Sequence, residues 1–94
     1  MNQRYNLIET DRSTTEDRSA MTIVEAFGML GLQDNAIARD LGGYPLARSS
    51  RFSRDRVRYY DLNSLEVIGT AEELGREIRL YDAQGRLIQR ITRR

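Results

Sequence analysis

Hydrophobic and polar residues alternate most clearly near the C-terminus, over residues 77–92 (E-I-R-L-Y-D-A-Q-G-R-L-I-Q-R-I-T). Two short runs of period two flank D-A-Q-G, and a glycine there can take the positive φ of a three-residue hairpin loop. The pattern therefore predicts a β-hairpin in which Tyr81 faces Leu87 and Leu80 faces Ile88. A lone hairpin is only marginally stable in water, so we expect an earlier element to pack on it.

This predicted hairpin has apolar side chains on both faces. Alternation places Ile78, Leu80 and Ile88 on one face, and Tyr81, Leu87 and Ile91 on the other. We expect helices to cover the first face. For the second we predict a homodimer with Tyr81, Leu87 and Ile91 at its interface, because terminal strands with spare apolar residues readily pair across a two-fold axis. The alternative is cover from residues 3–10, a weak strand pattern containing Tyr5, Leu7 and Ile8.

The first half of the chain has a helical pattern. Apolar residues recur at a spacing of three and four at Ala20, Ile23, Val24, Phe27 and Leu30, which predicts an amphipathic helix. Two overlapping cap-like pairs precede it, Ser13 with Glu16 and Thr14 with Asp17. Gly31 is expected to end this helix. A second, shorter helix is predicted from Asp34, as N-cap, to Gly42.

The middle of the chain predicts mixed structure. Residues 44–55 are rich in arginine and small polar residues, which favours a long surface loop. Strands are expected at 56–60, with Val57 and Tyr59 on one face, and at 65–69, with Leu65 and Val67 inward. Thr70 and Glu73 form a capping-box pattern, which predicts one or two helical turns before Gly75.

Together these elements predict an α+β domain. Two N-terminal helices would pack on a small three- or four-stranded antiparallel sheet that ends in the C-terminal β-hairpin. The 94 residues suffice for one modest core. We expect a single domain over residues 19–94, preceded by a flexible or edge-strand N-terminal segment, residues 1–18.

Composition narrows the function. The chain has no cysteine and no histidine, which removes thiolate chemistry, disulfides, the usual zinc ligands and the commonest general base. We therefore expect a binding protein without a cofactor or metal, and not an enzyme. No apolar run approaches the roughly 20 residues of a membrane span, and the N-terminus lacks the apolar core of a signal peptide. These features predict a cytoplasmic protein that does not contact a membrane.

All 15 basic residues are arginine, although the net charge is only +1. A GC-rich genome would explain the choice of arginine over lysine, but the distribution along the chain is uneven. Arginines mix with hydroxyls and aromatic rings between residues 48 and 60, a combination that contacts phosphates and stacks on bases. The candidate binding residues are Arg48, Arg51, Phe52, Arg54, Arg56, Arg58 and Tyr60.

This stretch predicts a small nucleic-acid-binding regulatory protein that contacts DNA or RNA. Two alternatives remain. The stretch could be a solvated loop and edge strand whose charges deter aggregation. It could also belong to a protein-interaction module, such as an inhibitor, an antitoxin-like protein or an assembly subunit, whose Arg and Tyr side chains bind an acidic protein.

Two short stretches resemble known motifs. N-A-I-A-R-D-L-G-G, residues 35–43, is similar to the first half of a helix-turn-helix, but the following Y-P-L-A-R-S-S has no apolar period for a recognition helix. Y-D-A-Q-G-R-L-I, residues 81–88, resembles one unit of the Y-D-x-x-G-R-L repeat of large RHS-type shell proteins. Such repeats need stacked neighbours, and a single copy is present, so no function is carried over.

Overall fold

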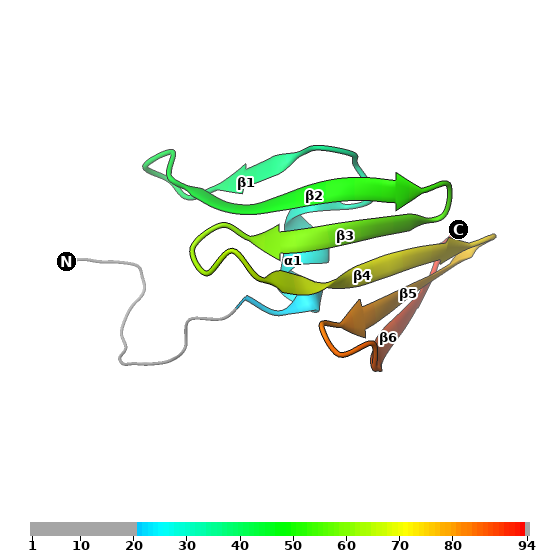
Figure 1. Cartoon of the computed structure of the whole chain (residues 1–94). Helices are drawn as coiled ribbons and strands as arrows, with labels where there is room; N and C mark the ends of the chain where they lie inside the picture. Colours follow the sequence, from blue (N-terminus) through cyan, green and yellow to red (C-terminus); the bar gives the residue numbers. More distant parts are fainter. Residues whose placement is uncertain (1–20, 94) are drawn as a thin grey trace.

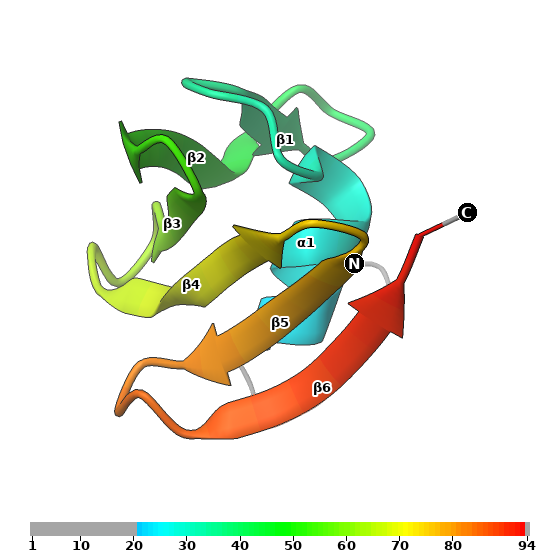
Figure 2. The same cartoon turned by 90° about the vertical axis from the view of Figure 1, so that its right-hand side faces the viewer.

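A single helix packs on a six-stranded antiparallel sheet in the computed structural model, which describes residues 21–93. The elements in chain order are α1 (Ile23–Leu30), β1 (Ile37–Arg39), β2 (Pro45–Ser53), β3 (Arg56–Asp61), β4 (Val67–Leu74), β5 (Glu77–Asp82) and β6 (Leu87–Thr92). The strands lie side by side in sequence order, and α1 lies behind them in Figure 1. Figure 2 shows that the sheet curves around α1.

The predicted fold class is wrong, because residues 21–93 form one helix where two were expected and six strands where three or four were expected. The second helix, predicted over residues 34–42, is replaced by β1 and the turns beside it, so the helix-turn-helix likeness has no structural basis. The loop predicted over residues 44–55 is mostly β2. Thr70, where a helical turn was predicted, lies in the middle of β4.

Tertiary contacts explain why residues 34–42 do not form a helix. Ala38 of β1 pairs with Ala47 of β2, and both side chains are buried. Just before β1, the Ser49 hydroxyl donates to the Gln33 carbonyl (2.7 Å) and accepts from the Ala36 N–H (3.1 Å). Pairing with β2 thus satisfies the backbone groups that a helix would have satisfied internally.

The first predicted helix is confirmed in type, although its N-terminus is later than expected. Thr22 is the N-cap, and its hydroxyl accepts from the Glu25 N–H while the Glu25 carboxylate accepts from the Thr22 N–H, which completes a capping box. The cap-like pairs at residues 13–17 lie outside the described residues. At the other end Gly31 has a positive φ and its N–H donates to the Phe27 carbonyl (2.8 Å), so the predicted helix end is confirmed.

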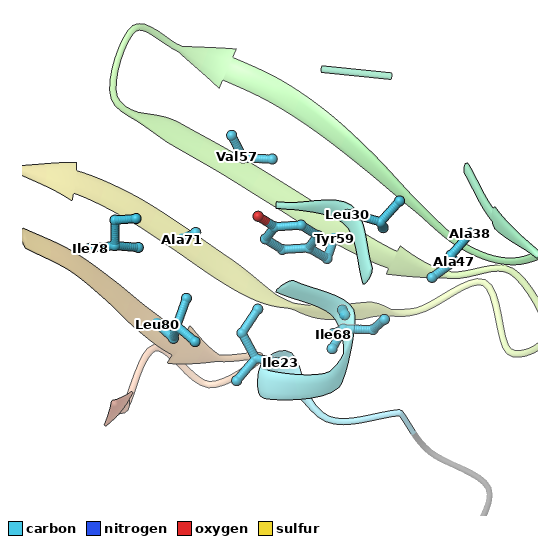
Figure 3. Close-up of a cluster of buried hydrophobic side chains, with 11 residues drawn as sticks. Ile23, Leu30, Ala38, Ala47, Val57, Tyr59, Ile68, Ala71, Ile78 and Leu80 are labelled. Atoms are coloured by element: carbon cyan, nitrogen blue, oxygen red, sulfur yellow. The ribbon is translucent and has the colours of Figure 1, made fainter. Parts of the chain in front are cut away.

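The core fills the space between α1 and the concave face of the sheet, as Figure 3 shows. From α1, Ile23, Ala26 and Leu30 are buried, whereas Val24 of the predicted stripe is exposed. The sheet contributes Ala38, Ala47, Val57, Tyr59, Ile68, Ala71, Ile78 and Leu80. Val57 and Tyr59 share one face of β3, as predicted, and both are fully buried. The prediction for Leu65 and Val67 is wrong, because both are exposed and Ile68 is buried instead.

The C-terminal hairpin is confirmed, with a shift in register. Gly85 has φ of 84°, and Tyr81 pairs with Leu87 as expected. A bulge follows, so that Leu80 pairs with Gln89 and not with Ile88. The extra residue turns Ile91 toward the core, opposite Ile78, and leaves Ile88 exposed.

Two further expectations concern membrane-spanning helices and the N-terminal segment. No helix among residues 21–93 is long and apolar enough to cross a membrane. The strand or tail predicted within residues 1–18, including Tyr5, Leu7 and Ile8, lies outside the described residues, as does its proposed cover of the hairpin.

Candidate functional site

The candidate site is the face of the sheet opposite α1, called the open face here. Cross-strand pairing places its side chains in three rows that run across the strands. The central row is Ser50, Arg58, Thr70, Tyr81 and Leu87, flanked on one side by Arg56, Glu72, Arg79 and Arg90 and on the other by Arg48, Tyr60 and Val67. Hydroxyls, rings and guanidinium groups therefore share one continuous surface.

Two arginines of the open face lie on aromatic rings. The Arg58 guanidinium carbon is 4.2 Å from the centre of the Phe52 ring, and that of Arg48 is 5.3 Å from the centre of the Tyr60 ring. Arg48 also donates to the Asn35 side-chain oxygen (3.0 Å). Within residues 21–93 neither guanidinium is within ion-pair distance of a carboxylate. Both groups are thus held in place while their charge stays available.

The other arginines of the open face are paired with glutamates. Arg56 contacts the Glu72 carboxylate at 3.2 Å, and the Tyr81 hydroxyl donates to the same carboxylate at 3.0 Å. Glu77 accepts from Arg79 at 3.2 Å and lies 3.5 Å from Arg90. Five arginines, namely 48, 56, 58, 79 and 90, thus share this face with Glu72 and Glu77.

A groove of about 550 Å³ crosses the open face between Phe52 and the β5–β6 turn. It is lined by Phe52, Arg56, Arg58, Val67, Thr70, Glu72, Tyr81, Asp82, Ala83 and Gly85. This volume lies within the range of small-ligand sites, and the lining combines rings with fixed polar groups.

The structure brings together five of the seven predicted binding residues and separates two. Arg48, Phe52, Arg56, Arg58 and Tyr60 belong to the open face.

Arg51 instead belongs to the face that carries α1, where its guanidinium donates to the carbonyls of Leu32 (2.8 Å) and Arg54 (2.6 Å) and lies 3.9 Å from Glu73. These contacts give Arg51 a structural role, and Arg54 lies in the exposed β2–β3 turn.

The open face also contains residues that sequence reasoning did not assign to the binding site: Thr70, Glu72, Arg79, Tyr81 and Arg90. The stretch V-I-G-T-A-E-E-L contains the alternation of a strand, which would have identified Thr70 and Glu72. The interpretation of T-A-E-E as a capping box led to a predicted helical turn instead. Read as a strand, these positions would have pointed away from the core.

The predicted dimer residues do not form one surface. Tyr81 and Leu87 pair on the open face, whereas Ile91 lies on the opposite face and packs against the core. The homodimer stays a prediction, and sedimentation at micromolar concentration would test it.

Asp82 stabilises the β5–β6 turn next to the groove. Its carboxylate accepts from the N–H groups of Arg86 (2.9 Å) and Gln84 (3.0 Å) and from the Arg86 side chain (2.9 Å). These hydrogen bonds lower the pKa of the Asp82 carboxyl, and the bond from the Arg86 backbone N–H has the largest effect. Because the pKa is lower in the folded than in the unfolded chain, this stabilisation is present above the unfolded value of about 3.9 and is lost as the pH falls through the folded value.

We expect Asp82→Asn to lower the melting temperature at neutral pH and to have a smaller effect in acid. The variant keeps a side-chain oxygen but lacks the charge that strengthens the hydrogen bonds. Thermal unfolding followed by circular dichroism between about pH 7 and pH 3 measures the difference from the wild type. A difference that stays constant over this range would contradict the assignment.

No group of three or more acidic side chains among residues 21–93 is arranged to bind a metal ion. Comparisons with known protein families, with curated proteins and with solved structures found no match to this chain. Function is therefore inferred from the geometry of the open face alone.

Proposed function

We propose that this protein binds nucleic acid through the open face, with Arg48 and Arg58 contacting phosphates. The observation that carries the proposal is the pair of guanidinium groups stacked on Tyr60 and Phe52, neither of which has a carboxylate partner among the described residues. Each guanidinium lies over a ring, which restricts its position, and it keeps N–H donors that can bind an oxyanion.

The spacing of these two arginines suits successive phosphates. Arg58 pairs with Ser50, and Arg48 lies two residues before Ser50 on β2, so the two arginines are diagonal neighbours on paired strands. Side chains in this relation start about 7 Å apart. A single nucleic-acid backbone could thus contact both arginines in turn.

Charge also favours a polyanion on this face. The open face has five arginines and two glutamates, a surplus of three positive charges, whereas the whole chain has a net charge of only +1. Asp82, which also lines the groove, is paired with the Arg86 side chain. Such a surface attracts a phosphate backbone from a distance, and its attraction weakens with salt.

Replacing both stacked arginines, as Arg48→Gln/Arg58→Gln, tests the proposal. We expect the affinity for a labelled oligonucleotide of about twelve residues to fall about tenfold at roughly 100 mM salt. Loss of two phosphate contacts should also make the slope of log K against log salt shallower by about 1.5. Fluorescence anisotropy over a salt series measures both quantities.

The matched control is Arg54→Gln/Arg76→Gln, which removes the same charge from two turns. It should change the affinity less than about threefold, because exposed charges in turns act only over distance. Equal effects of the two double variants would remove the assignment to the open face. If the wild-type chain binds polyglutamate but does not bind nucleic acid at about 50 mM salt, the acidic-protein alternative is favoured.

A further inference from the structure

We propose that the groove on the open face receives one unpaired nucleobase with an amino group, so that the preferred partner is a single strand. This inference rests on the nucleic-acid binding proposed above and adds the place and chemical type of one base. Four features of the open face support this inference: the spacing of the strands around the groove, the planar side chains at its sides, the carboxylate at its floor, and the position of α1 on the opposite face.

The groove has the width of a slot for a flat ring. In the central row, the small side chain of Thr70 on β4 lies between Arg58 on β3 and Tyr81 on β5. Two interstrand spacings put about 10 Å between the backbones that carry Arg58 and Tyr81. A base between two stacking partners needs about twice the 3.4 Å stacking distance, which is less than this backbone separation.

The walls of the slot are planar groups. On one side the Arg58 guanidinium is stacked on the Phe52 ring at 4.2 Å, and on the other Tyr81 is half-buried with its hydroxyl anchored to Glu72. Bases stack on both aromatic and guanidinium planes. Because both walls are held by contacts within the protein, little side-chain entropy is lost when a base enters.

The floor of the groove carries a fixed carboxylate that can accept a hydrogen bond from a neutral donor. Glu72 is only 15% exposed, and Arg56 and Tyr81 fix its carboxylate through one bond to each oxygen. A carboxylate accepts about four hydrogen bonds, so acceptor capacity remains. Asp82 also lines the groove, and Arg56 and Arg58 balance the two carboxylates, so the floor offers acceptors that would bind an exocyclic amine.

A carboxylate acceptor in the groove discriminates between the bases. Cytosine presents its N4 amine to a carboxylate, whereas thymine presents the O4 acceptor at the same position. We therefore expect the groove to prefer cytosine over thymine. The phosphates of the same strand would lie beside the groove on Arg48 and Arg58.

Duplex DNA cannot use the groove in the same way. A base in a duplex is paired and stacked, and extruding it costs a few kcal/mol. The one helix of the described residues, α1, packs on the opposite face and cannot enter a major groove from this side. Single strands should consequently bind more tightly than a hairpin duplex of the same composition.

Anisotropy titrations with oligo-dC, oligo-dT and a hairpin duplex test the inference. The wild type should bind oligo-dC about fivefold more tightly than oligo-dT and than the duplex. Glu72→Gln should reduce the dC/dT ratio to below about two, and it should raise the affinity for oligo-dT because a repulsive carboxylate is lost. Glu66→Gln, with the same change of charge in the β3–β4 turn, should keep the wild-type ratio.

Thr70→Phe provides a second variant that leaves every charge in place. Phenylalanine suits a strand and would fill the slot, so the preference for single strands should disappear while the salt slope stays unchanged. Equal binding of single strands and duplex by the wild type, or a dC/dT ratio that Glu72→Gln does not change, would overturn the base site and leave the phosphate contacts intact. Failure to bind any nucleic acid would overturn the proposed function itself.

Discussion

Tyr59→Ala is expected to lower the free energy of unfolding by about 4 kcal/mol, as is typical for removing a buried aromatic side chain. Tyr59 is fully buried in the middle of β3, beneath α1, as Figure 3 shows. Domains of this size have a total stability of roughly 5–15 kcal/mol, so the variant would lose about a quarter to four-fifths of it. Urea denaturation followed by circular dichroism measures the loss.

Tyr59→Phe separates the hydrogen bond from the packing. The Tyr59 hydroxyl donates to the Gly31 carbonyl at the end of α1, and burial raises the pKa of this hydroxyl, which keeps it protonated. Removing it leaves the carbonyl without that partner, at a cost of about 1–2 kcal/mol. Tyr44→Ala, at a tyrosine that is 61% exposed, should cost less than about 0.5 kcal/mol. Similar losses for Tyr59→Ala and Tyr44→Ala would contradict the assigned core.

Gly69→Ala is expected to destabilise the fold by about 3 kcal/mol through overpacking. A Cβ at this position would lie 2.2 Å from the Tyr81 carbonyl oxygen and 3.1 Å from the Ile23 Cβ. Gly69 pairs with Tyr59 on one side and Asp82 on the other, so it cannot move without disrupting two ladders. The crowding arises because β4, β5 and the first turn of α1 meet here.

Gly28→Ala is the matched control, because a Cβ there would meet nothing within 4 Å. Gly28 lies inside α1, where alanine is favoured over glycine by about 1 kcal/mol, so this variant should be more stable than the wild type. Chemical denaturation of both variants measures the two opposite changes. The assignment of Gly69 as a close-packing position would be wrong if both substitutions had the same sign and size.

The sequence predicted the elements whose signals are local and use large side chains. Ile23 and Leu30 belong to the stripe with helical spacing, and both are buried residues of α1. The D-A-Q-G turn with Gly85 formed the hairpin as expected, because a positive φ at glycine is a property of the backbone itself. The exclusion of thiol and imidazole chemistry also follows from composition alone.

The register bulge at Leu80 was beyond local reasoning. Alternation assumes a strict period of two, and one extra residue exchanges the faces of every side chain after it. As a result, Ile91 faces the core where the outer face was expected, and Ile88 is exposed.

Tertiary structure decided β2 and, with it, the candidate site. Two inward positions of β2, Ala47 and Ser49, are fully buried, and their small side chains let the sheet approach α1 closely. Small inward residues give no hydrophobic alternation, so the stretch resembles a loop in sequence although it is a strand paired on both sides. The sequence determined that arginines and rings are concentrated between residues 48 and 60. The pairing of β2 with β3 and of β3 with β4 decided that Arg48 and Arg58 point outward, beside Thr70 and Glu72. The same pairing turns Arg51 inward. Local sequence cannot show this, because the face on which a strand residue lies is set by partner strands distant in the chain.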